Sequence, residues 1–171
     1  MTFPCPNCGI PAIEHGIYCQ ACYRLVDMDE LTEIMPCLFL GGEASVFNFA
    51  GDKLDVRPWV LFPEYSKDRT SLLTMLSLCQ LIHARVQIKK SIAVYCAAGA
   101  ERSPLVIACY LVLTGKYPTF YKAYKFLQSI RPIVLDHSDL LHPDMISVIE
   151  RRKACGSQVC FWTLEDFVKE V

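Results

Sequence analysis

A cysteine and an arginine frame a short loop between two apolar segments of the chain. The apolar run Ser91–Tyr95 precedes Cys96, and five residues separate Cys96 from Arg102. A longer apolar run, Pro104–Leu113, begins directly after Ser103. The short run predicts a buried strand and the longer one a buried helix. The fold must therefore place a cysteine at the end of a strand and an arginine at the start of a helix.

The loop between this strand and this helix has the features of an anion-binding site. Successive backbone N–H groups of such a loop can turn inward, and the positive end of the following helix adds to their field. A phosphate dianion would be held there without a metal, with the cysteine sulfur beneath the phosphorus. The residues predicted to line the loop are Cys96, Ala97, Ala98, Gly99, Ala100, Glu101 and Arg102.

The same field predicts a reactive thiol. A cavity built for a dianion also stabilises a thiolate and lowers a cysteine pKa from about 8.5 by several units, which makes Cys96 a nucleophile. The planar guanidinium of Arg102 can bind two phosphoryl oxygens, and the Ser103 hydroxyl can help the sulfur leave a thiophosphate intermediate. The alternative is a buried structural cysteine beside a surface arginine. The register of Gly99, Arg102 and Ser103 disfavours that alternative.

The loop and its flanks resemble the cysteine-dependent protein tyrosine phosphatases, and in particular their dual-specificity branch. Ile34–Gly41 is similar to the strand that opens the catalytic domain of that branch. Arg102–Leu111 is similar to the helix after the loop, and Ile130–Val134 to the Arg-Pro ending of the next helix. The resemblance covers roughly residues 34–150. It implies an α/β fold with a sheet flanked by helices, and hydrolysis through a phosphocysteine intermediate.

Two positions depart from the pattern of this family. Tyr95 stands where the family usually has a histidine before the cysteine. The family's general acid is an aspartate on a loop after a strand, and here Pro58–Phe62 is the expected strand and Glu64 the carboxylate that follows it. Asp68 is the alternative acid, although its surroundings indicate the start of a helix. A third alternative is that the site has no general acid.

The resemblance implies a protein phosphatase that acts on phosphotyrosine and also on phosphoserine and phosphothreonine. Superfamily members that act on inositol lipids favour lysines in the loop, whereas this loop has alanines and Glu101. An alternative is a phosphatase or triphosphatase of RNA 5′ ends, because a polyphosphate leaving group needs no general acid. A third function is a non-catalytic phosphate-binding adaptor, which Tyr95 favours and the joint presence of Cys96, Arg102 and Ser103 disfavours.

Four cysteines near the N-terminus predict a metal site. Cys5 and Cys8 form one Cys-x-x-Cys pair, and after ten residues Cys19 and Cys22 form a second. Four thiolates suit one tetrahedral Zn²⁺, so we expect a structural zinc ribbon, with catalysis itself needing no cofactor. Two disulfides are the alternative. The ribbon offers contact to a protein or a nucleic acid, and Arg24 as the single nearby basic residue disfavours nucleic acid.

Length and composition suit one catalytic domain with small appendages. The chain has 171 residues and a net charge of −1. We expect a zinc ribbon over residues 1–26, a linker near Leu25–Glu33, a catalytic domain over 33–153, and a tail helix packed on it over 154–171.

Ten cysteines and the absence of a signal-like start favour an intracellular chain, cytoplasmic or nuclear. The longest apolar run, Leu105–Leu113, is too short for a membrane span, so we expect no membrane partner. Cys37, Cys79 and Cys109 lie in apolar patterns that predict core positions. His137 follows the Arg-Pro ending where the family has Pro-Asn, which places it near the site either as a support for the loop or as a capping or exposed histidine.

The apolar pattern predicts alternating strands and helices, as in a sheet covered by helices on both faces. The stretch Gly42–Phe62 is shorter than its counterpart in the resembling family, so we expect a strand–helix piece to be reduced and one side of the cleft to be open. The expected strands are 37–40, 56–62 and 92–95, and the expected helices are 69–84, 103–114 and 119–129.

Overall fold

The structure, a computed structural model, describes residues 4–5, 9, 30–59, 69–141 and 143–151. Its strands are β1 (Thr32–Met35), β2 (Leu38–Gly42), β3 (Asp52–Asp55) and β4 (Ile92–Cys96). Its helices are α2 (Arg69–Gln87), α3 (Arg102–Leu113), α4 (Phe120–Ile130) and α5 (Pro143–Arg151), with short 3₁₀ helices η1 (Ala44–Val46) and η3 (Ser138–Leu140).

The four strands form one mixed sheet in the order β1-β2-β4-β3. β1 is antiparallel to β2, whereas β2 and β3 are both parallel to β4. The carboxyl ends of the three parallel strands therefore meet at one edge, where Gly42 pairs with Cys96 and Asp55 pairs with Tyr95. In open α/β sheets, ligands bind beyond this edge.

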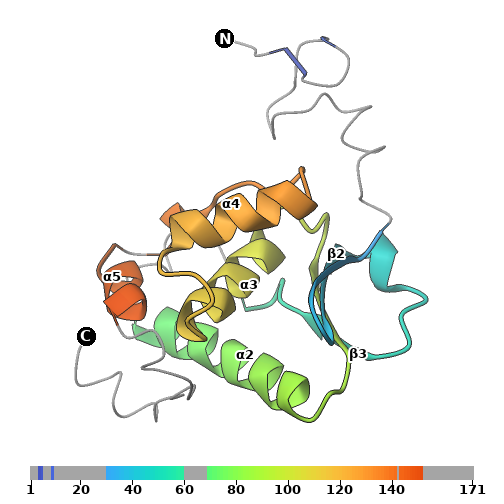
Figure 1. The fold of residues 1–171 in the computed structure, drawn as a ribbon, viewed down its shortest axis with the longest axis horizontal. Helices are drawn as coiled ribbons and strands as arrows, with labels where there is room; N and C mark the ends of the chain where they lie inside the picture. The colour runs from blue at the N-terminus through green and yellow to red at the C-terminus, as the bar shows by residue number, and fades with distance from the viewer. Residues whose placement is uncertain (1–3, 6–8, 10–29, 60–68, 142, 152–171) are drawn as a thin grey trace.

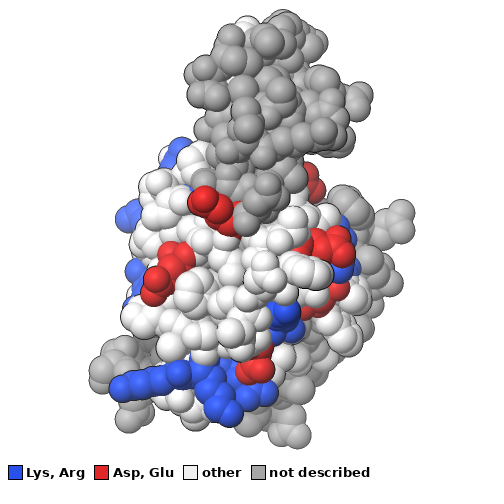
Figure 2. All heavy atoms as spheres, turned by 90° about the vertical axis from the view of Figure 1, so that its right-hand side faces the viewer, with Lys and Arg blue, Asp and Glu red and all other residues white. Residues whose placement is uncertain are grey.

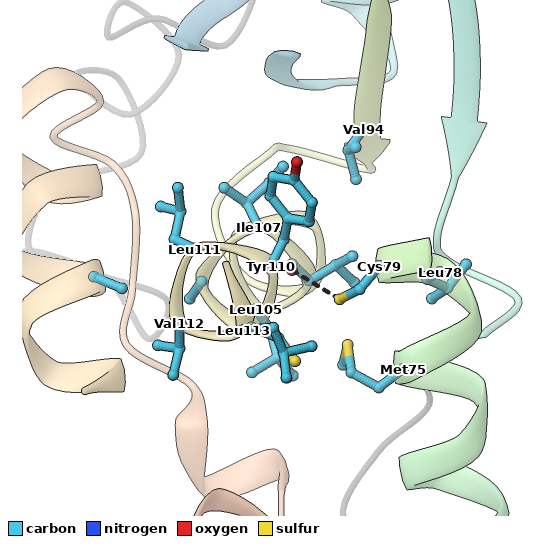
Figure 3. Packing of buried hydrophobic residues seen from close by; sticks show 14 of the residues in the cluster. Met75, Leu78, Cys79, Val94, Leu105, Ile107, Tyr110, Leu111, Val112 and Leu113 are labelled. Carbon is cyan, nitrogen blue, oxygen red and sulfur yellow. Dashed lines mark hydrogen bonds between the residues drawn. The ribbon is translucent and has the colours of Figure 1, made fainter. Parts of the chain in front are cut away.

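Helix α3 forms the centre of the core, because every residue from Ser103 to Leu113 is buried. A helix that is apolar on all sides needs neighbours on all sides, and α3 contacts α2, α4, α5, β2 and β4. Figure 3 shows Tyr110 of α3 beside Cys79 of α2, whose thiol donates to the Val106 carbonyl at 3.9 Å. This packing fixes the start of α3 against the end of β4.

Helices α2 to α5 lie on one side of the sheet (Figure 1), so in the part of the chain described here the prediction of helices on both faces is wrong. The reason is the length of the connection between β2 and β3. Residues 43–51 contain only η1, and a crossover that includes a helix needs at least about 10–12 residues. The predicted reduction of a strand–helix piece over Gly42–Phe62 relative to the resembling family stays a prediction, because its last residues lie outside the described ranges.

The strand predicted over 56–62 is wrong over its described part. β3 lies at Asp52–Asp55, and residues 57–59 form a turn in which the Trp59 N–H donates to the Val56 carbonyl at 3.1 Å. Pro58 lacks the N–H that a further ladder bond would need. β3 is polar because it is an edge strand with limited burial, so the apolar residues after it gave a misleading signal.

The other predicted elements in the described ranges agree with the structure to within a few residues. The strand β1, whose Thr32 and Glu33 fall in the predicted linker, and the helix α5 were not predicted. Cys79 and Cys109 are core residues as predicted, but Cys37 is half-buried in the β1–β2 turn at φ 73°. None of the helices in the described ranges combines the length and the apolar composition that crossing a membrane requires. The segments predicted as zinc ribbon and tail helix lie almost wholly outside the described residues.

Candidate active site

The loop between β4 and α3 begins and ends as the sequence predicts. Cys96 is the last residue of β4 and is 3% exposed, and Arg102 is the first residue of α3. Between them Gly99 adopts φ +69°, a left-handed conformation that side chains disfavour. The strand, the loop and the helix thus bring Cys96, Arg102 and Ser103 to the sheet edge where the parallel strands end.

The carbonyl groups of the loop point away from Cys96 and accept hydrogen bonds from neighbouring segments. The peptide oxygens of four consecutive loop residues accept hydrogen bonds from three surrounding segments: Ala97 from the Glu43 N–H (3.1 Å), Ala98 from Arg131 Nη2 (3.2 Å), Gly99 from Arg131 Nε (3.0 Å) and Ala100 from the Leu135 N–H (2.8 Å). In a trans peptide the next N–H points opposite to the carbonyl. The amides of residues 98–101 therefore face the inside of the loop.

The Cys96 thiol has a lowered pKa. Burial of the sulfur is the largest single effect and opposes ionisation, but hydrogen bonds from the Ser103 hydroxyl and from the amides of Ser103, Gly99 and Glu101 together outweigh it. The sulfur lies 3.2 Å from Ser103 Oγ. The Gly99 and Glu101 amides are two of the inward amides of the loop, so groups that would hold an anion also stabilise a thiolate.

Two glycines let the loop approach β2 closely. A Cβ on Gly99 would lie 2.5 Å from the Gly41 carbonyl carbon, and a Cβ on Gly42 would lie 2.8 Å from the Ala97 oxygen. Both obstacles are backbone atoms, which cannot rotate away. Gly99 in the loop and Gly42 at the end of β2 therefore allow the loop to lie against the sheet edge.

Sequence comparison matches the part of the chain that contains this loop. A family model described as "Dual specificity phosphatase, catalytic domain" matches residues 61–143. The chain is 30% identical over 124 residues to human dual specificity protein phosphatase 12, a match that covers 70% of this chain and 36% of that protein. It is 35% identical over 80 residues to phosphatidylglycerophosphate phosphatase PTPMT2 of Arabidopsis thaliana, covering 47% and 32%. The chain thus spans about a third of the length of these curated relatives.

Solved structures share the fold. The crystal structure of human DUSP28 superposes with a TM-score of 0.55 at 21% identity, covering 71% of this chain and 93% of that one. A leucine-rich-repeat and phosphatase-domain protein of Entamoeba histolytica gives a TM-score of 0.59 at 14% identity, covering 73% and 93%. Sequence and fold both match the dual specificity phosphatase superfamily. The chain is therefore similar to the dual specificity phosphatases in sequence over residues 61–143 and in fold.

Arg131 is a residue of this candidate site that the sequence reasoning did not single out. It caps the end of α4, is fully buried, and holds the carbonyls of Ala98 and Gly99. A signal was present, because the arginine belongs to the Arg-Pro ending that resembles the superfamily. Its role was not readable because the partners lie more than thirty residues away in the chain.

Arg57 and Asp55 form a second group beside the loop that the sequence reasoning missed. Arg57 donates to both carboxylate oxygens of Asp55, at 2.9 and 2.8 Å, and to Glu43 at 3.0 Å. Its guanidinium also lies over the Tyr95 ring, 5.6 Å from the centroid. Tyr95, in place of the usual histidine of the resembling family, thus supports a cation next to the loop of residues 97–101.

Hydrogen bonds from Arg57 lower the pKa of the Asp55 carboxyl, against an opposing effect of burial, and the charge of Arg102 adds to the lowering. Asp55 is therefore held as a carboxylate near Arg102 and is a poor proton donor. The two acids considered from the sequence, Glu64 and Asp68, both lie outside the described residues.

His137 lies beside the loop, as predicted. Its Nε2 is 3.9 Å from a Glu101 carboxylate oxygen, and its Nδ1 is 3.6 Å from Asp139. These contacts are to the carboxylates of Glu101 and Asp139 and not to Cys96, so a direct effect of His137 on the thiolate stays a prediction.

Of the four predicted zinc ligands, Cys8, Cys19 and Cys22 lie outside the described residues. Cys5 is buried, and its carbonyl accepts from the Gly9 N–H at 2.8 Å. Gly9 has φ +77°, so a glycine suits the end of this turn. Within the described ranges no three His, Cys, Asp or Glu side chains are grouped to hold a metal ion, and the zinc site therefore stays a prediction.

Proposed function

We propose that the chain is a protein phosphatase that hydrolyses phosphotyrosine, and also phosphoserine and phosphothreonine, through a phosphocysteine intermediate on Cys96. The observation that carries the proposal is the inward-facing amide ring around a buried sulfur of lowered pKa. Such a ring stabilises negative charge before the substrate arrives. The match to the phosphatase superfamily supports the same class of reaction.

In the first step the Cys96 thiolate attacks the phosphorus, and an S–P bond forms as the bond to the leaving oxygen breaks. The loop amides and Arg102 hold the non-bridging oxygens through this step. Glu64 donates a proton to the leaving oxygen. In the second step Glu64 accepts a proton from water, the oxygen attacks the phosphorus, and Cys96 leaves as a thiolate stabilised by the Ser103 hydroxyl.

Charge around the loop supports a phosphoprotein over a polyanionic lipid headgroup. Glu43, Asp55 and Glu101 all lie at or beside the loop. Extra phosphates would meet these carboxylates at close range, which is unfavourable. A phospholipid monoester with a single terminal phosphate is a second candidate, because one relative is a phosphatidylglycerophosphate phosphatase by name.

The position of exposed lysines gives little support to an RNA 5′ end as substrate. Lys53, Lys89 and Lys90 are exposed, but they lie at or just before the starts of β3 and β4, at the opposite end of these strands from Cys96. Figure 2 shows Lys and Arg gathered mainly toward the lower end of the face it displays, with uncharged side chains over most of the rest. A nucleic-acid strand needs basic groups along its path into the site.

Hydrolysis of a small aryl phosphate across pH 5 to 8, with EDTA present, tests the mechanism. We expect turnover that survives the chelator and vanishes in Cys96→Ser. In Glu64→Gln the fall in rate with rising pH, which reports deprotonation of the general acid, should disappear. Folded protein that binds vanadate without any turnover would instead indicate the adaptor or a triphosphate substrate. Competition between a phosphopeptide and phosphatidylglycerophosphate then separates the two substrate candidates.

We further propose one structural Zn²⁺ on Cys5, Cys8, Cys19 and Cys22, in a ribbon that contacts a partner protein, and an intracellular location. The buried Cys5 and the tight turn that ends at Gly9 support the metal. Elemental analysis of the purified full chain should give about one zinc per chain. Cys8→Ser should lose the metal, while Cys155→Ser, which changes a cysteine outside the quartet, should retain it.

A further inference from the structure

Arg131 connects the loop between Cys96 and Arg102, called the phosphate loop from here on, to the start of the first strand of the sheet. On one side it donates from Nε to the Gly99 carbonyl at 3.0 Å and from Nη2 to the Ala98 carbonyl at 3.2 Å. On the other side Nη1 donates to the Glu30 carbonyl at 2.8 Å and to Thr32 Oγ1 at 3.0 Å. The residue is 0% exposed. Burial of a charge is costly unless its donors are satisfied, and these four bonds satisfy donors on all three nitrogens.

We propose that Arg131 is a positioning residue that orients the phosphate loop for anion and thiolate binding, and that the start of β1 anchors it in this role. The proposal rests on the proposed phosphatase function and adds a residue that acts from behind the loop. By holding the carbonyls of Ala98 and Gly99, Arg131 fixes the peptide planes whose N–H groups, on Gly99 and Ala100, point to the other side. The Gly99 amide is one of the donors to the Cys96 sulfur.

Electrostatics strengthen this geometric effect. A charged donor on a carbonyl polarises the peptide, which increases the partial positive charge on the N–H at its opposite end. The two polarised peptides follow Ala98 and Gly99, in the middle of the loop. Arg131 therefore favours negative charge inside the loop without touching the substrate.

Joining the loop carbonyls to residues 30–32 calls for a guanidinium. A lysine ammonium is a compact charge on a flexible stem, whereas the planar fork of arginine donates in fixed directions. Arg131 uses that fork to join two loop carbonyls to two acceptors on residues 30–32. Arg131→Lys keeps the buried charge but loses the fork, and Thr32→Val removes one anchor remote from the loop.

The test measures two properties of the folded full-length chain. The first is the pH midpoint for alkylation of Cys96 by iodoacetamide, followed on the peptide that contains it. The second is the affinity for vanadate. Ser129→Ala is the matched control, because Ser129 Oγ bonds the Phe126 carbonyl at 2.6 Å within the last turns of the same helix.

In Arg131→Lys we expect a higher alkylation midpoint and vanadate affinity reduced at least about tenfold, since small displacements of a binding loop have large effects. In Thr32→Val we expect the alkylation midpoint to rise as well and vanadate affinity to fall at least about threefold, which is the lower range for the loss of one hydrogen bond. Ser129→Ala should match the wild type in both. Circular dichroism and cooperative thermal unfolding identify the variants that are folded.

The outcomes separate this proposal from the proposed function. Folded variants with wild-type midpoint and affinity would overturn the role of Arg131, since a purely structural arginine would change stability alone. If Arg131→Lys does not fold, an unchanged Thr32→Val overturns it. Wild-type protein that binds vanadate and has a lowered midpoint but no turnover would refute the proposed protein phosphatase, and the same comparison of variants would still decide the role of Arg131. Wild-type protein with neither property would overturn both.

Discussion

The sulfur of Cys96 lies 3.2 Å from the hydroxyl oxygen of Ser103, across the junction of a strand and a helix. The same hydroxyl lies 3.3 Å from the Gly41 carbonyl oxygen. A serine has one O–H proton, so it donates to the sulfur or to the carbonyl. A hydrogen bond to a charged acceptor is the stronger of the two. Ionisation of Cys96 therefore favours donation to sulfur, and the thiolate is stabilised when it forms.

Replacing Ser103 by alanine should slow release of the thiolate from the phosphocysteine intermediate. A hydrogen bond to a charged group contributes about 1.5 to 3 kcal/mol, so we expect kcat to fall by roughly 10- to 100-fold. Rapid-quench kinetics with an aryl phosphate should then show a burst followed by slow turnover. Ser129→Ala is the control, because the Ser129 hydroxyl bonds the Phe126 carbonyl on α4. Equal kcat values in the two variants would contradict the assigned role.

The lowered pKa of Cys96 should make folding stability depend on pH in a defined direction. The folded chain binds its thiol proton less tightly than the unfolded chain, so the contribution is fully present above the unfolded pKa of about 8.5. It is lost as pH falls through the folded value. The free energy of unfolding of the wild type, relative to Cys96→Ser, should therefore rise with pH up to about pH 8.5. Urea denaturation of both proteins over this pH range measures the two free energies of unfolding. A difference between them that does not change with pH would contradict the prediction.

Gly99→Ala should impair both stability and anion binding. The new Cβ would meet the Gly41 backbone at 2.5 Å, in a residue held at φ +69°. Gly115, after α3, has φ +77° and provides a control for alanine in the left-handed conformation at a glycine outside the loop. We expect Gly115→Ala to lower stability by about 1 to 2 kcal/mol with vanadate affinity unchanged. Gly99→Ala should lower stability further and weaken vanadate binding, and retention of wild-type affinity would show that the loop can move away from β2.

Replacing the buried Ile107 of α3 by alanine should destabilise the whole domain. Ile107 is 0% exposed in the centre of the core, and replacing a buried isoleucine by alanine costs about 2 to 5 kcal/mol. Leu81 on α2 is 41% exposed, so Leu81→Ala should cost well under half as much. Chemical denaturation of both variants checks the difference. Similar losses would mean that Leu81 is covered in solution.

The site could be predicted to the extent that its groups are close together in the chain. Cys96, Arg102 and Ser103 belong to one strand–loop–helix unit, whose apolar pattern and loop length are visible in the sequence. Arg131 escaped the same reasoning, since nothing local shows that its guanidinium returns to Ala98 and Gly99. β3 was misplaced for a related reason, because pairing with β4 selected the polar Asp52–Asp55 over the more apolar residues that follow.

The sequence alone determined the chemistry at the centre of this protein, because a cysteine, a short loop and an arginine at a helix start are set by neighbouring residues. It also determined the α/β character and the central buried helix α3, through the periodicity of apolar residues. Only the tertiary structure decided which way the loop peptides face. That orientation depends on Glu43, Arg131 and Leu135, which reach the loop from separate segments. The physical reason is that a peptide plane turns to satisfy its carbonyl, and here the donors are supplied by the fold.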